Sequence, residues 1–541
     1  MQKKLTKFMS LLKRIISNRV LIYGLIYAGF IFLHLAFFNI NAAEWGDSYR
    51  ILRASEYIRL GAYPTDEKRP PLFSLILAAR PGHVDQIFWG RFVLLGISCA
   101  TLFLFTKLAR LFISNEKWRI TAIALFWLNP VLFYWSLRIY ADIPFMLLVL
   151  LMFYLFTKWK ATLTWIQAVV LGLLCGLSVL MRFEGYLLSA AIFIGVLYPN
   201  ISCFSEFFRK LFVSLRKNLR QIGFYTLGLL LIVVPFWLWR NPLNSSYFEE
   251  PEGRSYNLQM VLIFAASLLC LFGFTSAAFF MGRDYKRLVK TLVTNPAMLV
   301  FILLELTLIL FWPAALPRLF IPILPLLLLL LIPAMQTYFE DSNKNMRTLL
   351  SLSLLVILLP LARIMLKMQF LVIQKEFMLL VLLLQVVLVY FIYSKRVNWF
   401  IALTLASSFV WALSPVYLHK NLYLSIKEAS EYVAENVHGF VGYNDKSSVA
   451  DWYINDKNLS AKENTNLHGE YYQIEANKNI AFDKLKAHGY DYLLLTNEHN
   501  TSTTLDLDKR PYLEVIRDVS YNINGVEFFT LILKVNREYQ E

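Results

Sequence analysis

The sequence predicts a polytopic α-helical membrane protein that ends in a small α/β domain. Of the 541 residues, 57% are hydrophobic and only 17% are charged, whereas soluble proteins average about 45–50% apolar and about 25% charged residues. Apolar stretches that are long enough to cross a bilayer, about 20 residues each, recur along most of the chain. From about residue 421 the composition becomes more polar, which predicts a separate domain.

The net charge of +16 does not indicate nucleic-acid binding. A soluble chain with this charge would suggest such a partner, but here the basic residues fall in short loops between apolar stretches. That distribution is typical of the cytoplasmic loops of membrane proteins. The four cysteines form no CxxC or CxxH spacing, so neither a disulfide framework nor a zinc site is expected.

The apolar pattern predicts about thirteen membrane-spanning helices. In chain order they are expected at 20–40, 87–106, 120–137, 142–157, 162–181, 184–199, 222–239, 258–281, 296–313, 318–335, 348–366, 377–393 and 398–417. Together with the connecting loops they form a transmembrane domain over residues 1–420.

Loop charge predicts the orientation of these helices. If the N-terminus is cytoplasmic, all six loops that should face the cytoplasm carry Lys or Arg, and the alternate loops are short or of mixed charge. The basic start of the chain has no small-residue cleavage site and is expected to be a cytoplasmic tail. An odd number of spans then places the C-terminal domain, residues 421–541, on the outer side.

That domain has mixed elements. "SIKEASEYVAENV" has helical spacing, and "FDKLKAHGYDYLLLTN" indicates a helix, a glycine stop and a buried strand. Asn524-Gly525 between two apolar alternating runs predicts a β-hairpin. We expect a small α/β domain of a size that folds independently.

The first outer loop, residues 41–86, is far longer than most connections between helices, and such loops are usually functional. After Asp47, apolar Ile51, Ala54 and Ile58 recur at helical spacing with arginines between them. This predicts an amphipathic helix on the membrane surface. Asp47 is either a cap of this helix or a catalytic carboxylate, and the pattern alone leaves both interpretations open.

Other charged residues share the predicted outer face with Asp47. Each has a structural explanation, because basic residues anchor membrane interfaces and Asp142 before Pro144 suits a helix start. The alternative is that they converge on an anionic lipid head group, which suits the planar fork of arginine. These residues are Lys68, Arg69, Arg138, Asp142, Arg182, Glu184 and Arg318. Glu305 lies in mid-span, where a carboxylate is a functional candidate by default, but the sequence assigns it no role.

Three stretches in this order resemble the GT-C superfamily of membrane glycosyltransferases: "GDSYR…GAYPTDEKRPPL", "RIYADIPF" and "PRLFIPILPLLLLL". The most similar members are relatives of protein O-mannosyltransferase and of the aminoarabinose transferase that modifies lipid A. The resemblance covers about residues 20–340 and extends weakly into the tail. Ser48 follows Asp47 where the eukaryotic mannosyltransferases have a paired Asp-Glu. The WWD-type signature of oligosaccharyltransferases is missing, which argues against transfer of a whole glycan to asparagine.

The resemblance implies an inverting transfer of one sugar from a dolichyl- or undecaprenyl-phosphate donor, within membrane lipid, to a protein, lipid or glycan acceptor. Asp47 matches the catalytic base, and Asp142 matches a second acidic position that Glu184 would support. By the resemblance, the ligands of the donor phosphate are first of all Arg50, Lys68, Arg69 and Arg318, and then Arg138 and Arg182. Some relatives use a divalent metal such as Mg²⁺ or Mn²⁺ near these acids and others do not, so Asp47 and Asp142 are the candidate ligands if one binds.

The chemistry needs only these parts. A phosphate-linked sugar already has a good leaving group, so one carboxylate that deprotonates the acceptor is sufficient, and cations stabilise the departing phosphate. Two alternatives remain. A transporter or lipid flippase would also have many helices, although the matched broken helices typical of transporters are not seen. A non-catalytic scaffold of the cell envelope would use the tail for binding.

Overall fold

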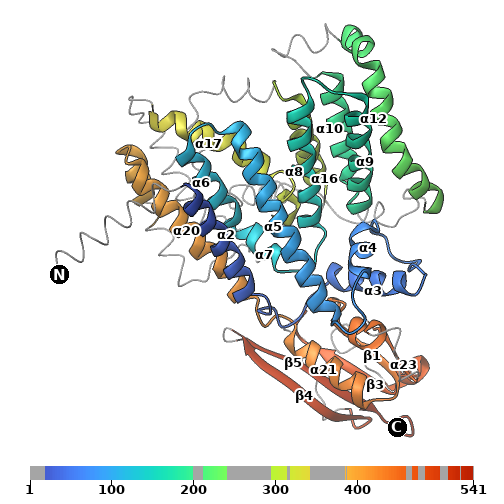
Figure 1. Cartoon of the computed structure of the whole chain (residues 1–541). Helices are drawn as coiled ribbons and strands as arrows, with labels where there is room; N and C mark the ends of the chain where they lie inside the picture. Colours follow the sequence, from blue (N-terminus) through green and yellow to red (C-terminus); the bar gives the residue numbers. More distant parts are fainter. Residues whose placement is uncertain are drawn as a thin grey trace, which may run out of the picture.

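A computed structural model of the chain describes residues 19–198, 211–240, 294–312, 317–340, 384, 387–457, 466–472, 482–499, 510–523 and 526–539. Long helices lie alongside one another and form the larger part of the molecule, and a five-stranded sheet lies at one end of them (Figure 1). Two short helices of the first loop, α3 (Asp47–Arg59) and α4 (Leu72–Ala78), lie between these two parts.

In the part of the chain that the structure describes, the helical part consists of apolar helices, several of which follow one another after short connections. In chain order they are α2 (Arg19–Ala36), α5 (Gln86–Phe112), α6 (Glu116–Trp127), α7 (Pro130–Ser136), α8 (Asp142–Trp159), α9 (Trp165–Met181), α10 (Gly185–Leu197), α12 (Leu211–Trp239), α16 (Pro296–Phe311), α17 (Leu324–Glu340) and α20 (Val397–Leu418). Among the described residues, α5, α8, α12 and α20 are long and apolar enough to cross a membrane, and five further helices are apolar but shorter. Large apolar side chains such as Leu238 and Phe311 are exposed on the outside. The chain is therefore that of a multi-pass membrane protein.

One predicted span is wrong. The stretch 120–137 is not a single helix, because α6 ends at Trp127 and α7 begins at Pro130. The side chain of Asn129 accepts hydrogen bonds from the backbone N–H groups of Val131 and Leu132, at 3.0 and 3.2 Å. An asparagine cap followed by proline at the first helical position starts a new helix and cannot continue an old one.

Two further differences concern the later spans. Arg318 is not part of the helix predicted at 318–335, because it lies in a 3₁₀ turn, η4 (Pro317–Phe320), and α17 begins only at Leu324. The predicted spans at 258–281 and 348–366, and most of the one at 377–393, lie outside the described residues. The number of thirteen helices therefore stays a prediction.

Helices α9 and α12 pack unusually closely through glycines. A Cβ atom at Gly172 would lie 2.1 Å from the carbonyl oxygen of Tyr225, and one at Gly228 would lie 2.4 Å from that of Val169. Small residues allow such close backbone approach between membrane helices. The contact fixes the position of α9, whose C-terminal end is capped by Arg182.

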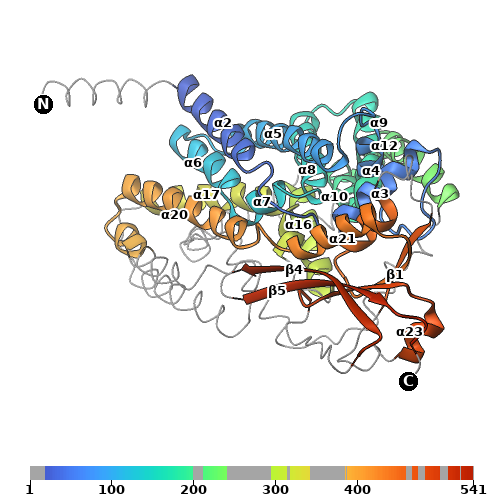
Figure 2. The same ribbon diagram turned by 90° about the horizontal axis from the view of Figure 1, so that it is seen from below.

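The C-terminal region matches its predicted elements. Its helices include α21 (Leu424–Asn436) and α23 (Phe482–His488), and its strands are β1 (Gly439–Tyr443), β2 (Leu467–Tyr471), β3 (Tyr492–Thr496), β4 (Leu513–Ile523) and β5 (Val526–Val535). The strand order is β2-β1-β3-β5-β4, with β1 parallel to β2 and β3 and with β5 antiparallel to β3 and β4. Helix α21 packs across this sheet (Figure 2). The predicted helix, the helix–glycine–strand unit and the hairpin strands are confirmed.

The sheet region packs directly on α3. The ring of Tyr49 stacks on that of Trp452 with their centroids 5.4 Å apart, and both side chains are buried. Arg53 forms an ion pair with Asp456 at 3.3 Å. One buried apolar cluster includes residues of both the helical part and the sheet region. The first loop therefore packs against both the helical part and the sheet region.

Candidate functional site

A cavity of about 340 Å³ lies where the first loop, the ends of α8, α9 and α10, the turn η4 and the sheet region meet. Its charged lining is mostly positive. The cationic residues are Arg50, Lys68, Arg69, Arg182, Arg318 and Lys446, and the carboxylates are Asp47, Asp142 and Glu184. Eight of the nine site residues predicted from the sequence line this one cavity, although they come from four separate stretches of the chain.

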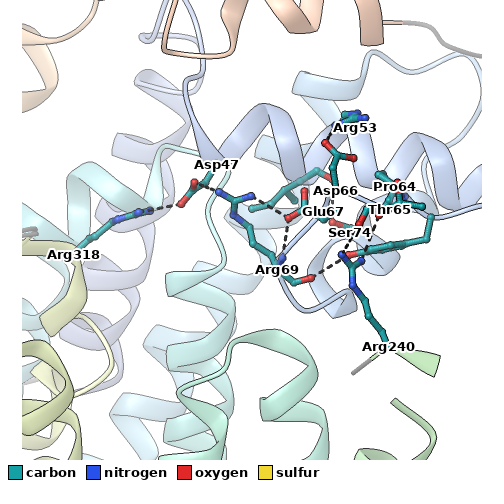
Figure 3. A network of polar contacts seen from close by, with 12 residues as sticks. Asp47, Arg53, Pro64, Thr65, Asp66, Glu67, Arg69, Ser74, Arg240 and Arg318 are labelled. Carbon is teal, nitrogen blue, oxygen red and sulfur yellow. Dashed lines mark hydrogen bonds and ion pairs between the residues drawn. The ribbon is translucent and has the colours of Figure 1, made fainter. Parts of the chain in front are cut away.

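Asp47 lies between two guanidinium groups (Figure 3). Arg69 donates from Nη2 to Asp47 Oδ1, and Arg318 donates from Nη2 to Asp47 Oδ2 over 3.0 Å. The Asp47 side chain nevertheless remains 28% exposed. Both carboxylate oxygens are therefore engaged by cations, while the group stays accessible from the cavity.

Asp47 is not the cap of its helix. It is the first residue of α3, the N-cap is Gly46, and no side chain accepts a capping hydrogen bond there. Gly46 has φ +52°, a left-handed conformation that glycine adopts without strain. The capping interpretation of Asp47 is thus contradicted, and its carboxylate is turned towards the two arginines instead.

Each arginine has its own support. Arg69 also donates from Nη1 and from its backbone N–H to Glu67 Oε1, at 3.0 and 2.9 Å, and Glu67 is buried. The guanidinium carbon of Arg318 lies 4.7 Å from the ring centre of Tyr140 and 5.4 Å from that of Trp135. Packing on aromatic faces stabilises a cation and fixes the orientation of the guanidinium group.

A second cluster lies beside the first. Arg182 Nη1 donates to Asp142 Oδ1 over 2.6 Å, and Arg182 Nε donates to Glu184 Oε1 over 3.1 Å. Asp142 begins α8 but accepts no capping hydrogen bond, so its capping interpretation is contradicted as well. Asp142 Oδ2 lies 3.8 Å from Arg318 Nη1, which joins the two clusters.

The charges set the protonation of the site. Burial alone raises the pKa of the Asp47 carboxyl, but Arg69 and Arg318 outweigh it and hold this pKa well below its usual range. The pKa of Glu184 is likewise lowered, since Arg182 outweighs the effect of burial. The pKa of Lys68 is lowered by burial and by repulsion from Arg69 and Arg50. The cavity therefore favours anions and disfavours further cations.

Arg138 and Glu305 lie elsewhere. Arg138 is 1% exposed and does not line the cavity, and its guanidinium packs against the rings of Trp45 and Tyr134. It is thus the one predicted phosphate ligand that does not line this cavity. Glu305 is buried in α16 and interacts electrostatically with Glu184, Arg182 and Asp142. It therefore lies near the second cluster but does not line the cavity.

Sequence reasoning missed four residues of the site. Glu67 orients Arg69, Tyr140 packs on Arg318, and Lys446 and Ser448 of the sheet region line the cavity. Glu67 and Tyr140 are in stretches already singled out, so the sequence offered a signal for them. Nothing in the sequence links Lys446 or Ser448 to the first loop, because that contact depends on how the sheet region docks.

The candidate metal ligands do not form a metal site with the other residues that the structure describes. Asp47 and Asp142, the candidate ligands, are both paired with arginines. In the part of the chain that the structure describes, no group of three or more His, Cys, Asp or Glu side chains is arranged to hold a metal ion. The guanidinium group of Arg318 contacts both carboxylates, and its positive charge between them disfavours a divalent cation.

No protein-family model matches the sequence, and no curated protein matches it. Two crystal structures of ArnT from Cupriavidus metallidurans are similar in fold. The one bound to undecaprenyl phosphate has a TM-score of 0.58 at 12% identity, covering 94% of this chain and 97% of that one. The apo structure has a TM-score of 0.55 at 13% identity, covering 93% of this chain and 97% of that one.

A third similarity is weaker. The oligosaccharyltransferase of Archaeoglobus fulgidus, tethered to an acceptor peptide, has a TM-score of 0.40 at 12% identity, over 84% of this chain and 61% of that one. The two ArnT structures match over nearly the whole of both chains and therefore show the fold. The chain thus has the fold of the two ArnT structures.

Proposed function

We propose that this protein is an inverting glycosyltransferase that moves one sugar from a polyprenyl-phosphate donor to an acceptor at the outer surface of the membrane. Asp47 is the general base, and Arg69 and Arg318 bind the donor phosphate. The sugar, the polyprenol and the acceptor are not specified by the site. The N-terminus is cytoplasmic in this proposal, and the domain over residues 421–541 is on the outer side.

One observation carries the proposal: a partly exposed carboxylate lies between two arginines in a cavity with a surplus of positive charge. Arg318 Nη1 is buried and has no hydrogen-bond acceptor among the described residues. A buried guanidinium N–H without an acceptor is costly, and a phosphate oxygen would satisfy it. The ArnT structure that has the same fold binds undecaprenyl phosphate, a ligand of this chemistry.

The reaction needs one bond to form and one to break. The acceptor hydroxyl or amine attacks the anomeric carbon, and the bond from that carbon to the phosphate oxygen breaks. The acceptor proton passes to Asp47, and the polyprenyl phosphate leaves with the bonding electrons. Arg69 and Arg318 stabilise its charge. Attack from the side opposite the phosphate inverts the anomeric centre.

The donor also explains how a carboxylate with a low pKa becomes a base. While both oxygens of Asp47 accept hydrogen bonds from guanidinium groups, the carboxylate is ionised but weakly basic. A phosphate near Arg69 and Arg318 competes for the same N–H donors. Asp47 then loses part of its stabilisation and its basicity rises when the donor is in place.

The cavity supports an enzyme over a non-catalytic scaffold, which would need no cavity. Asp47 and Arg318 line one cavity, which lies at the ends of the apolar helices α8, α9 and α10. A donor whose tail stays in the bilayer must present its phosphate at such a position.

The test is a transfer assay with purified protein in nanodiscs. A panel of radiolabelled undecaprenyl- and dolichyl-phosphate sugars is incubated with envelope fractions, and the fraction that gains label is identified. We expect one donor to label one acceptor class. If no donor of the panel transfers its sugar while the folded protein fails to bind undecaprenyl phosphate, the proposal is wrong.

The Arg318→Ala variant tests the donor site separately. It should weaken binding of undecaprenyl phosphate by about tenfold or more, because a charge-assisted hydrogen bond contributes roughly 1.5–3 kcal/mol. Arg53→Ala is the control, since Arg53 pairs with Asp66 and Asp456 and does not line the cavity. Equal affinity in the Arg318→Ala variant and the wild type would contradict the assignment.

A further inference from the structure

The lining of the cavity includes a loop of the sheet region. This loop follows β1 and carries Lys446 and Ser448, which both line the cavity. Its residue Ser447 accepts a hydrogen bond at 2.6 Å from the backbone N–H of Gly46, the residue that directly precedes Asp47. The sheet region therefore touches the chain one residue away from the proposed base.

Hydrogen bonds with Asp445 and His499 hold the loop in one conformation. The side chain of Asp445 is fully buried, and its oxygens accept hydrogen bonds from the backbone N–H groups of Ser447 and Ala450, at 2.7 and 2.8 Å. His499 Nε2 lies 2.8 Å from Asp445 Oδ1 and 3.1 Å from the backbone nitrogen of Lys446. A loop fixed on a rigid sheet can place a side chain reproducibly in a site.

Lys446 differs from the arginines that neutralise the cavity carboxylates. Asp47 is paired with Arg69 and Arg318, and Asp142 with Arg182. Among the described residues, no carboxylate lies within ion-pair distance of the exposed Lys446. An unpaired ammonium group that lines a cavity with other cations gains most from an anionic ligand.

We propose that Lys446 binds the phosphate of the lipid-linked donor, so that the C-terminal domain completes the substrate site and is more than an accessory module. This inference rests on the proposed function and adds a phosphate ligand from a domain that the sequence did not connect with the site. Lysine acts on phosphate as a mobile point charge, which suits an exposed residue that lines the cavity.

The experiment measures binding of undecaprenyl phosphate to the full-length protein in nanodiscs of neutral phosphatidylcholine. The variants are Lys446→Ala, Lys446→Arg and Lys446→Glu. The matched control is Lys486→Glu, the same charge reversal at an exposed lysine of α23 outside the cavity. Melting temperatures are recorded for all variants, and no change is expected, because the side chain of Lys446 is exposed.

We expect Lys446→Ala to weaken binding about tenfold and Lys446→Glu by more, as for the loss of one charge-assisted hydrogen bond. Lys446→Arg should stay close to the wild type, and Lys486→Glu should equal it. Wild-type affinity in Lys446→Glu would overturn this inference alone. A folded wild-type protein that does not bind undecaprenyl phosphate would overturn the proposed function as well.

Two further arms identify the source of the anion. Inorganic phosphate and phosphatidylglycerol are titrated as competitors of undecaprenyl phosphate, and neither should compete at equal concentration. If phosphatidylglycerol competes and its binding is also lost in Lys446→Glu, the lysine binds a general anionic lipid surface, and the donor assignment is wrong.

Discussion

Glu44 and Asp47 lie three residues apart, and each is paired with arginine, but their surroundings are opposite. Glu44 is fully buried, and its Oε1 lies 2.8 Å from Arg91 Nη2. Its Oε2 accepts a hydrogen bond from the backbone N–H of Ile139 at 3.3 Å. Asp47 is 28% exposed and lies in the cavity.

The arginine partners differ in the same way. Arg91 also donates to Asn39 Oδ1 and to the carbonyl oxygen of Asn41, at 3.2 and 3.1 Å. Arg318 instead has a buried N–H without an acceptor in the described part of the chain. An ion pair is therefore no sign of function by itself. Access from a cavity and unsatisfied donors separate the Asp47 pair from the Glu44 pair.

The largest effect should come from Asp47→Asn. Removal of a general base lowers turnover by about 10²- to 10⁴-fold, while the partly exposed side chain tolerates the change. Sugar transfer and the melting temperature are measured on the same preparation. Wild-type turnover in this variant would mean that Asp47, like Glu44, is not the general base.

Glu44→Ala should lower the stability of the protein, whereas Asp47→Asn should lower its turnover. It leaves Arg91 buried without its partner, and breaking a buried pair costs about 3–5 kcal/mol. We expect a large fall in melting temperature or in the yield of folded protein. A stable Glu44→Ala protein with lost transfer would mean that Glu44, and not only Asp47, belongs to the site.

The pH dependence sharpens the comparison. Because Arg69 and Arg318 hold the pKa of Asp47 low, the carboxylate remains ionised as the pH falls, and its pairing contributes stability that is lost only when the pH falls through that low pKa. Arg69→Ala removes one cation while burial remains, so the pKa rises.

The acid limb of kcat/KM should then move to higher pH by about 1–3 units. This limb reports a group of the free enzyme, so it does not depend on how much donor affinity the variant loses. Arg53→Ala, with partners outside the cavity, should leave the limb in place. An unmoved limb in Arg69→Ala would show that Asp47 is not the group that titrates.

The smallest effect is expected for a third carboxylate of the same loop. Asp66 pairs with Arg53 at 2.7 Å, but its side chain is 61% exposed. Exposed pairs contribute about 0–1 kcal/mol, so Asp66→Asn should change neither transfer nor the melting temperature noticeably. A clear loss of transfer would extend the site beyond the cavity.

Much of this arrangement could be predicted from the sequence. Apolar length identified most of the described helices, and Gly489 and the run around Asn524 marked the elements of the C-terminal region. Loop charge placed Asp47, Asp142 and Arg318 on one face, and in the structure they line one cavity. The break at Asn129 was also visible as an asparagine–proline pair, but the apolar run concealed it.

The rest depends on tertiary contacts. Glu44 and Asp47 look equivalent in the sequence, and only the packing of Arg91 beside the first loop distinguishes them. Arg138 and Arg318 look alike in the sequence, and only the structure shows that Arg318 lines the cavity and Arg138 does not. Lys446 is about 400 residues from Asp47 in the chain, and no local pattern records that the sheet region docks on α3.

The central claim is that Asp47 acts as a base beside a phosphate that the arginines bind. Its most direct test is the affinity of Asp47→Asn for undecaprenyl phosphate, measured on protein that has lost transfer. The account predicts binding at least as tight as in the wild type, since the substitution frees Arg69 and Arg318 from a competing carboxylate. Binding that is lost in proportion to turnover would contradict it and make Asp47 part of the donor site.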